Sequence, residues 1–234
     1  WASDIGGFEG NAQTFRLLVS LEPKSIDDVG VPRGLNLTRA SLLASMKYPW
    51  GSTQPDMDPS GRAKFGFYDL DSEVFEWARA GLPARVLAIE AQVMDFSDDV
   101  AYSVHDFEDA IVNSYLDPRE ISQAARWDEM AQGMSDWVGT LTPSRLRSAW
   151  DRLVALPGWV TEFDDSRVQL ASLKNLTSTL IGRFAEGASL IKDAEGITLE
   201  VPDTTREEIA LLKGLVAVHV MSPSARQPIY AHQR

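Results

Sequence analysis

The chain has 234 residues, of which 44% are hydrophobic and 24% charged, as in a folded protein with one large domain or two small ones. The absence of cysteine excludes disulfides, zinc–cysteine sites, iron–sulfur clusters and a cysteine nucleophile. No run approaches the roughly 18 apolar residues of a membrane helix, so no membrane partner is expected. A net charge of −12 argues against broad nonspecific binding to nucleic acid or anionic lipid.

The first residues, Trp1 to Asp4, read like the middle of a helical segment. They include no initiator methionine and no signal-peptide pattern. We therefore expect the chain to be the C-terminal piece of a longer protein, in a cytoplasmic setting.

Apolar spacing in the N-terminal part predicts helices separated by loops. The predicted helices cover residues 9–22, 35–48 and 69–80, with a polar connection at 23–33. Residues 50–66 are rich in proline, glycine and polar side chains and predict a long loop, which in a compact domain is often functional. A long helix is expected from 84 to 116, closed by Asp117-Pro118.

The C-terminal part continues the helical pattern. Helices are predicted at 120–138, 144–156 and 167–186, the second capped by Thr142 with Pro143 in its first turn. Alternation at 189–191 and 196–201 predicts a small β-hairpin. Thr205 and Glu208 fit a capping box that opens a last helix to residue 221, and the tail after Pro223 is polar. The pattern favours one mostly α domain.

The predicted helix at 84–116 carries an unusual charge pattern. Eight acidic residues and no Lys or Arg lie between Arg85 and Arg119. At about 100° per residue, one arc gathers polar residues and the opposite side gathers apolar ones. The polar arc holds Asp95, Asp98, Tyr102, His105, Asp106 and Asp109; the apolar side holds Ile89, Val93, Phe96, Val100, Val104, Phe107 and Ile111.

Two interpretations of the acidic arc remain open. A solvated helix face would normally interleave lysines, because like charges four residues apart repel. An arc whose charged residues are all acidic, and which also holds a Tyr and a His, fits a cation bound in front of the helix. Carboxylates suit Mg²⁺ or Mn²⁺, and the imidazole extends the range to Fe, Co or Zn. His105-Asp106 is not expected to be a complete metal-binding doublet, because the chain has only three histidines. His105 fits a hydrogen-bonding role beside a metal ligand better.

Several blocks of sequence together resemble the deoxyguanosine triphosphate triphosphohydrolases, the HD-domain dNTPases. The blocks, in family order, are residues 7–13 (GFEGNAQ), 35–40 (LNLTRA), 43–50 (LASMKYPW), 64–68 (KFGFY), 90–95 (EAQVMD) and 98–106 (DDVAYSVHD). The resemblance is densest over residues 6–110 and weaker through 173–177. It implies a mostly α fold, part of an HD-domain-type helical bundle with a small hairpin near the C-terminus. Residues 1–125 would be the remainder of the core, and 126–234 a C-terminal helical region packed on it.

The family's other motifs are missing from these residues. The family builds its metal site from an upstream His, a His-Asp doublet and one later Asp, and uses a further histidine in a Pro-Pro-Phe-Gly-His-type segment. Only the later Asp is present, and it matches Asp98. The catalytic residues are therefore unknown from this sequence. We expect residues 1–234 alone to hold no metal and to catalyse nothing.

The resemblance also implies roles in substrate binding. Tyr102 and Asp106 would contact the nucleotide sugar and phosphates, and an aromatic ring against deoxyribose can exclude a 2′-hydroxyl. Lys47 and Lys64 would supply positive charge to the triphosphate, and Tyr48 and Asn11 directional hydrogen bonds. From the residues alone, a structural interpretation is favoured for three of these residues: Asn11 as a helix interruption, Tyr48 as a core aromatic and Lys64 as a solvated loop charge. The resemblance reverses this preference.

The implied reaction is attack of water on the α-phosphorus of a dNTP, most simply dGTP. It releases a deoxynucleoside and intact triphosphate. A divalent metal, Mg²⁺ or Mn²⁺ first and Fe, Co or Zn after them, would polarise the phosphoryl oxygen and activate the water. The family also implies a homo-oligomer. Whether dNTPs or single-stranded DNA act as allosteric effectors is left open.

Two other classes compete with the enzyme. One is a non-catalytic nucleotide-binding module for regulation or assembly, which the missing histidines favour. The other is an HD-type phosphodiesterase, against which the Lys47-Tyr48 pair and the Tyr102/Asp106 spacing argue. An HD doublet upstream of Trp1 would discriminate the first class from the enzyme.

Overall fold

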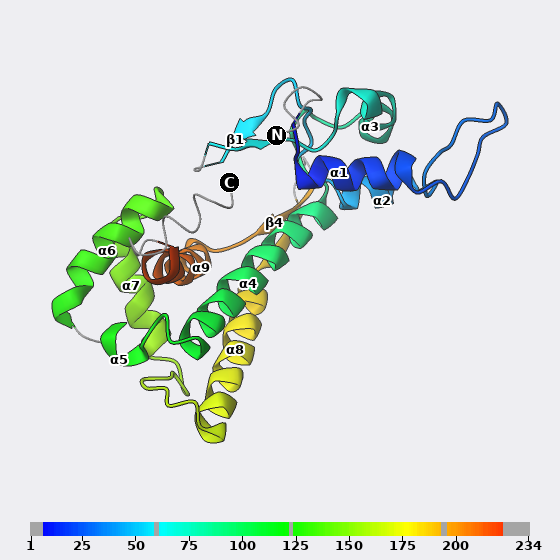
Figure 1. Ribbon diagram of the computed structural model, residues 1–234. Helices are drawn as coiled ribbons and strands as arrows, with labels where there is room; N and C mark the ends of the chain where they lie inside the picture. The colour runs from blue at the N-terminus through cyan, green and yellow to red at the C-terminus, as the bar shows by residue number, and fades with distance from the viewer. Residues whose placement is uncertain (1–6, 59–60, 122–123, 193–195, 222–234) are drawn as a thin grey trace. The chain divides into compact units, whose positions relative to one another are not determined.

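The computed structural model describes residues 7–58, 61–121, 124–192 and 196–221 (Figure 1). In this part of the chain helices dominate, and the strands form two small antiparallel sheets. The predicted mostly α fold with a small hairpin near the C-terminus is therefore confirmed. None of the described helices is both long and apolar enough to cross a bilayer.

Contacts divide the chain into two compact units. The N-terminal unit comprises residues 1–96 and 192–198, and the C-terminal unit comprises residues 97–191 and 199–234. Each is described by itself below. The division at residue 125, which rests on family resemblance, stays a prediction.

The first helix of the N-terminal unit follows the predicted pattern. α1 (Gly10–Arg16) continues into the π-helical turn η2 (Leu17–Leu21), which matches the predicted helix at 9–22. Glu9 caps it, because its carboxylate accepts hydrogen bonds from the first backbone N–H groups. Phe15 and Val19 are buried against α2 and α3.

α2 (Arg39–Ala44) is much shorter than the predicted helix at 35–48, so that prediction was wrong in extent. Gly34 and Asn36 have positive φ angles, which a right-handed helix excludes, and the Thr38 hydroxyl caps the helix only at its true start. Residues beyond Ala44 form turns.

The predicted loop at 50–66 contains a short antiparallel pair, β1 (Asp56–Met57) and β2 (Ala63–Lys64). Asp56 lies opposite Lys64, and Met57 opposite Ala63. η3 (Asp69–Asp71) and α3 (Ser72–Arg79) then confirm the predicted helix at 69–80.

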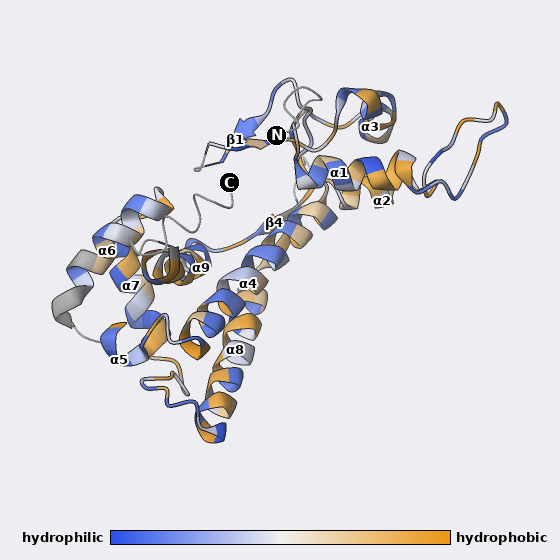
Figure 2. Cartoon of the chain, viewed as in Figure 1, coloured by the Kyte–Doolittle hydropathy of each residue, from blue (hydrophilic) through white to orange (hydrophobic). Residues whose placement is uncertain are grey.

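α4 (Ile89–Val112) is the long acidic helix, and it is shorter at both ends than predicted. Arg85 and Ser114 have positive φ angles, so the chain leaves helical geometry on both sides. The predicted apolar side is buried where it carries Val100, Val104, Phe107 and Ile111, whereas Val93 is exposed. Figure 2 shows the two-sided hydropathy of α4.

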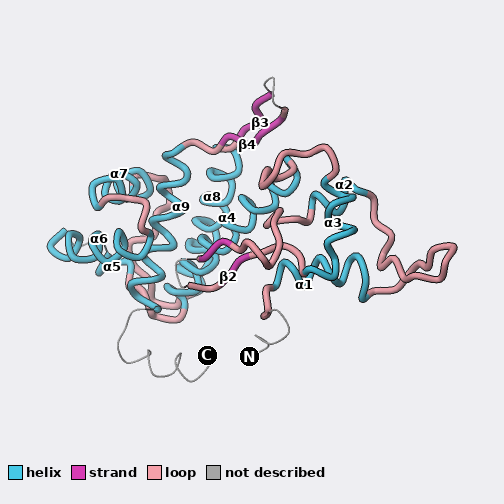
Figure 3. Tube along the Cα trace, turned by 90° about the horizontal axis from the view of Figure 1, so that it is seen from above, coloured by secondary structure: helices cyan, strands magenta, loops and turns pink. Residues whose placement is uncertain are grey.

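The C-terminal unit is built from helices. They are α5 (Pro118–Ile121), α6 (Ala124–Val138), α7 (Pro143–Val154), α8 (Arg167–Gly187) and α9 (Asp203–Val216), with the π-helical turn η4 (Ala217–Met221) continuing α9. Contacts join α6, α7 and α9 to one another, and Figure 3 shows these three helices as neighbours. The predicted cap at Thr142 with Pro143 at the first helical position is confirmed.

The predicted hairpin near the C-terminus is present as β3 (Ser189–Lys192) and β4 (Ile197–Glu200), the magenta pair labelled in Figure 3. Its turn and the polar tail after Pro223 lie outside the described residues.

The predicted capping box of the last helix was wrong. The helix starts at Asp203, and Pro202 stands at the N-cap without a side-chain bond. The Glu208 carboxylate is buried and instead accepts hydrogen bonds from Arg152 on α7 and Arg183 on α8, at 2.7 Å each. Glu207, also buried, binds Arg145 and Arg152. This ion network joins three helices of the C-terminal unit.

Replacing Glu208 with Ala should leave Arg152 and Arg183, whose side chains are only about one-third exposed, without this carboxylate partner. We expect the free energy of unfolding to fall by about 3 kcal/mol, because removing one partner of a buried pair leaves an uncompensated charge. Urea denaturation measures the loss. Asp151→Ala, which removes an exposed pair with Arg147, is the matched control and should change it by less than about 0.5 kcal/mol. Equal effects of the two variants would contradict the assignment.

Candidate functional site

Two segments of the N-terminal unit pack backbone to backbone and place several predicted residues together. The Gly66 N–H donates to the Trp50 carbonyl at 2.8 Å, and the Ser52 N–H donates to the Phe67 carbonyl at 3.3 Å. The Trp50 indole N–H donates to the Lys64 carbonyl at 2.7 Å. A Cβ at position 66 would lie 1.9 Å from the Tyr48 carbonyl oxygen, so only glycine permits this approach.

Asn11 and Lys64 meet at a residue that the sequence analysis did not single out. The Glu9 carboxylate oxygen Oε1 accepts a hydrogen bond from Asn11 Nδ2 at 3.2 Å and lies 3.6 Å from Lys64 Nζ. Glu9 is only 4% exposed. Its position directly before a helix was the available signal, because acidic residues stabilise helix N-termini.

Tyr48 lies among several charged groups. Burial raises the pKa of its phenol above the ordinary value; Lys47 opposes this shift, and the carboxylates of Glu9, Asp95 and Asp58 add to it. The ring is half-buried and lies 5.4 Å from the Trp50 ring, centroid to centroid. The phenol therefore remains a hydrogen-bond donor at neutral pH.

The two predicted phosphate-binding lysines are each next to carboxylates. Lys47 Nζ lies 2.6 Å from Asp95 Oδ1, and Lys64 Nζ lies 4.0 Å from Asp58 Oδ2 as well as close to Glu9. Asn11, Lys47, Tyr48 and Lys64 thus share one electrostatic neighbourhood in the N-terminal unit. The structure brings these four residues together, and their roles stay predictions.

The other predicted residues lie on α4 within the C-terminal unit. Asp98, Tyr102 and Asp106 are spaced four residues apart, so they follow one face of the helix, and all three are exposed. Tyr102 is 61% exposed, which does not fit a core packing role. Although the Asp106 side chain is exposed, protein atoms around it partly desolvate the carboxyl, and this together with the neighbouring Asp109 raises its pKa, while His105 opposes the rise.

Some of the negative charge on α4 is met by lysines from other segments. Within the C-terminal unit, Asp99 Oδ1 lies 2.8 Å from Lys213 Nζ, and the buried Glu108 carboxylate accepts hydrogen bonds from Lys174 and Thr177 of α8. Burial alone would raise the pKa of Glu108, but these two hydrogen bonds, together with the charge interactions with Lys174 and His105, outweigh it and the pKa is lowered. The acidic helix is thus partly neutralised by partners that sequence spacing within the helix could not reveal.

The residues present do not fit a complete metal centre. Within the part of the chain that the structure describes, no three His, Asp or Glu side chains are grouped so that they could hold an ion. Asp98 therefore stays a predicted metal ligand. His105 is exposed beside Asp106, and its predicted hydrogen-bonding role also stays a prediction.

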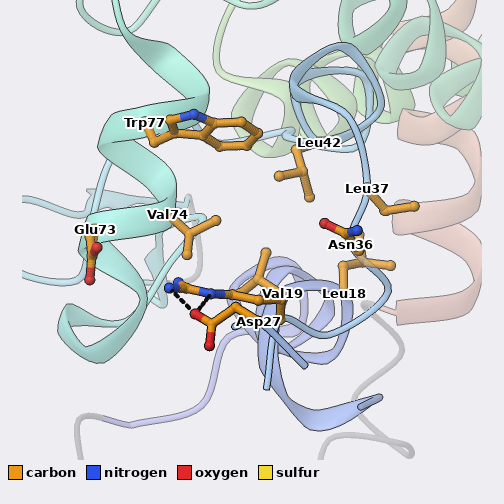
Figure 4. A pocket seen from close by; sticks show the side chains of 10 residues that line it. Leu18, Val19, Asp27, Asn36, Leu37, Leu42, Glu73, Val74 and Trp77 are labelled. Atoms are coloured by element: carbon orange, nitrogen blue, oxygen red, sulfur yellow. Dashed lines mark hydrogen bonds and ion pairs between the residues drawn. The ribbon is translucent and has the colours of Figure 1, made fainter. Parts of the chain in front are cut away.

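A separate pocket of about 410 Å³ opens in the N-terminal unit between η2, α2 and α3. Figure 4 shows its largely apolar wall, including Leu42, Val74 and Trp77. Its one lining cation, Arg33, is held by Asp27 at 2.6 Å. The pocket contains none of the predicted site residues, and its largely apolar wall does not fit a triphosphate.

Comparison with known proteins adds an independent observation. A curated "Deoxyguanosinetriphosphate triphosphohydrolase-like protein" of Bifidobacterium longum is 39% identical over 99% of this chain and 51% of its own length. Its namesake in Streptomyces coelicolor is 41% identical over 100% of this chain and 57% of its own length. This chain is a homologue of the deoxyguanosinetriphosphate triphosphohydrolase-like proteins.

The resemblance predicted from the sequence motifs is therefore confirmed. A namesake in Vibrio vulnificus is 34% identical over 47% of this chain. No family model matches the chain. The chain spans about half the length of the curated triphosphohydrolase-like proteins that it matches along nearly its full length.

Gly66→Ala tests the close packing that assembles the site. The added methyl must displace the Tyr48 backbone, so we expect the N-terminal unit to lose about 2–3 kcal/mol of stability. Gly182→Ala on α8 is the matched control, since a methyl there meets nothing within 4 Å and alanine favours a helix. Urea denaturation compares the two. A Gly66→Ala protein as stable as the wild type would show that the two backbones do not approach so closely.

Proposed function

We propose that a full-length protein containing this chain hydrolyses a deoxynucleoside triphosphate, dGTP first, to a deoxynucleoside and triphosphate. The observation that carries the proposal is the grouping of Lys47, Tyr48, Lys64 and Asn11 in one neighbourhood of the N-terminal unit. Two cations, a phenol and an amide are the groups that bind a polyphosphate. The homologues' shared name supports the same class of reaction.

The two lysines would contact the phosphates by exchanging carboxylate partners for phosphate oxygens. Both are partly exposed, and each has three ammonium donors, so a phosphate can be added without expelling every protein partner. The raised pKa of Tyr48 keeps its hydroxyl protonated, so it donates to a phosphate oxygen without adding negative charge. Together these groups offset the negative charge that develops on the phosphate oxygens as the bond from the α-phosphorus to the departing O5′ breaks.

The family resemblance assigns Tyr102 and Asp106, on the exposed face of α4, to the sugar. In this proposal the Tyr102 ring covers the deoxyribose where a 2′-hydroxyl would clash, and the Asp106 carboxylate accepts a hydrogen bond from a sugar hydroxyl. In the reaction, water oxygen bonds to the α-phosphorus, the bond from phosphorus to the sugar O5′ breaks, and O5′ takes a proton. No described residue is assigned as the catalytic base.

A nucleotide-binding module without catalysis is the second candidate. It is favoured by the absence, among the described residues, of three grouped metal-ligating side chains. Incubating the full-length protein with dGTP and Mn²⁺ separates the two. Release of deoxyguanosine and triphosphate supports the enzyme, whereas binding of dGTP by calorimetry with no product supports the module.

Asp98→Ala in the full-length protein should abolish release of triphosphate and lower metal content. Because Asp98 is exposed, its loss should change stability by less than about 0.5 kcal/mol. Product analysis, metal content and melting temperature are measured on the same preparation. Asp99→Ala, the adjacent exposed acid, should retain activity. Wild-type turnover and metal occupancy in Asp98→Ala would remove this residue from the site.

Tyr102→Ala should weaken discrimination between dGTP and GTP. Exclusion of a hydroxyl is worth about 1–3 kcal/mol, so the ratio of the two kcat/KM values should shrink roughly 10- to 100-fold, mostly by loss on the dGTP side. Tyr102→Phe keeps the ring and should keep the ratio. If Tyr102→Ala lowers only the melting temperature and leaves the ratio unchanged, the residue is a packing residue.

A further inference from the structure

Glu9 binds more groups than a helix cap requires. Its Oε2 accepts hydrogen bonds from the backbone N–H groups of Asn11 at 2.6 Å and Ala12 at 3.1 Å, which is the cap itself. Its second oxygen, Oε1, is not used by the helix. That oxygen faces the Asn11 amide and the Lys64 ammonium, at 3.2 and 3.6 Å.

The backbone of Glu9 and its side chain both contact the segment that runs from Lys64 in β2 to Tyr68. The Glu9 N–H donates to the Tyr68 hydroxyl at 3.3 Å. The Arg16 guanidinium lies over the Tyr68 ring, 4.4 Å from its centroid, and pairs with the buried Asp71 at 3.0 Å. Residue 9 is therefore held against the segment 64–68 by side chain and backbone together.

We propose that Glu9 is a positioning residue for the polyphosphate site. One carboxylate fixes Asn11 and Lys64 relative to each other, although they come from α1 and β2. The inference rests on the proposed function, because it assumes that Lys64 and Asn11 contact the nucleotide. Glu9 itself is buried and faces these two side chains, so it acts through them and contacts no substrate.

The hydrogen bond to Glu9 also determines what Asn11 presents. Its Nδ2 donates to the carboxylate, so the carbonyl oxygen Oδ1 points away from Glu9. A phosphate oxygen cannot donate to that carbonyl, whereas a sugar or base N–H or O–H can. Asn11 thus offers its carbonyl to a donor group of the nucleoside and its second Nδ2–H to a phosphate oxygen, and Lys64 fits the phosphates. Glu9 would set the distance between the two subsites.

Glu9→Gln separates positioning from capping. A glutamine oxygen still accepts from the first N–H groups of α1, so the cap is kept. Its NH₂ group then faces the Asn11 amide and the Lys64 ammonium, both of which are donors. The variant should therefore fold with a near wild-type melting temperature while Asn11 turns and Lys64 moves. Ser166→Ala, which removes the N-cap of α8, controls for the general loss of a helix cap.

Binding of inorganic tripolyphosphate to the full-length protein, measured by calorimetry, gives a readout that does not depend on turnover. With Lys64 misplaced, we expect Glu9→Gln to bind tripolyphosphate about 10-fold more weakly, the loss of one charge-assisted contact. A purely electrostatic role predicts the opposite sign, because removing a negative charge next to Lys64 would tighten the binding of an anion. Tighter or unchanged binding would overturn the proposal.

A double-mutant cycle shows whether Glu9 acts through Lys64. Lys64→Met should weaken tripolyphosphate binding, and adding Glu9→Gln to it should cost little more. Additive losses would overturn the proposal. For dGTP, Glu9→Gln should raise KM more than it lowers kcat.

The two proposals fail in different ways. If the wild type binds tripolyphosphate but releases no product from dGTP, the proposed reaction fails and the cycle still decides the role of Glu9. If the wild type does not bind tripolyphosphate at all, Lys64 does not serve a polyphosphate and Glu9 has nothing to position.

Discussion

The contact between the Gly66 backbone and the Tyr48 carbonyl is the constraint on which the candidate site depends. It leaves no room for a side chain at position 66, and in return two loop segments share hydrogen bonds that would otherwise be made to water. The residues on either side of this contact, Lys47, Tyr48 and Lys64, gain a fixed relative position from it. A site built on loops can be specific when its backbones are locked in this way.

The acidity of the chain is distributed so that the site lysines have carboxylate neighbours in the folded protein. Asp95 and Glu9 face Lys47 and Lys64, and other lysines neutralise Asp99 and Glu108 on α4. A cation held by protein carboxylates is already oriented before a ligand arrives, so less conformational entropy is lost on binding. The same pairing lowers the local attraction for anions in general, which favours a ligand that makes several contacts at once.

Local sequence signals predicted most helices but not their ends. The Thr142 cap and Pro143 correctly predicted the start of α7. The helix predicted at 35–48 was too long, because hydrophobic spacing does not reveal the positive φ angles at Gly34 and Asn36. The Thr205–Glu208 pair shows a similar limit. The sequence motif fits a capping box, but the Glu208 carboxylate accepts hydrogen bonds from arginines of α7 and α8 instead of from the helix N-terminus. Motif resemblance indicated Lys47, Tyr48, Lys64 and Asn11, and it could not reveal the side-chain contacts that join Asn11 and Lys64 through Glu9.

The ion network of the C-terminal unit has a consequence for how that unit unfolds. Its bonds join residues 25, 56 and 62 positions apart in the chain, through Arg183, Arg152 and Arg145. If α7 or α8 separates, a buried carboxylate of α9 loses an arginine partner, and if α9 separates, the arginines of α7 and α8 lose their carboxylates. Partly open states are therefore costly, and α7, α8 and α9 should exchange their protected amide hydrogens with solvent at a common rate, as one cooperative block.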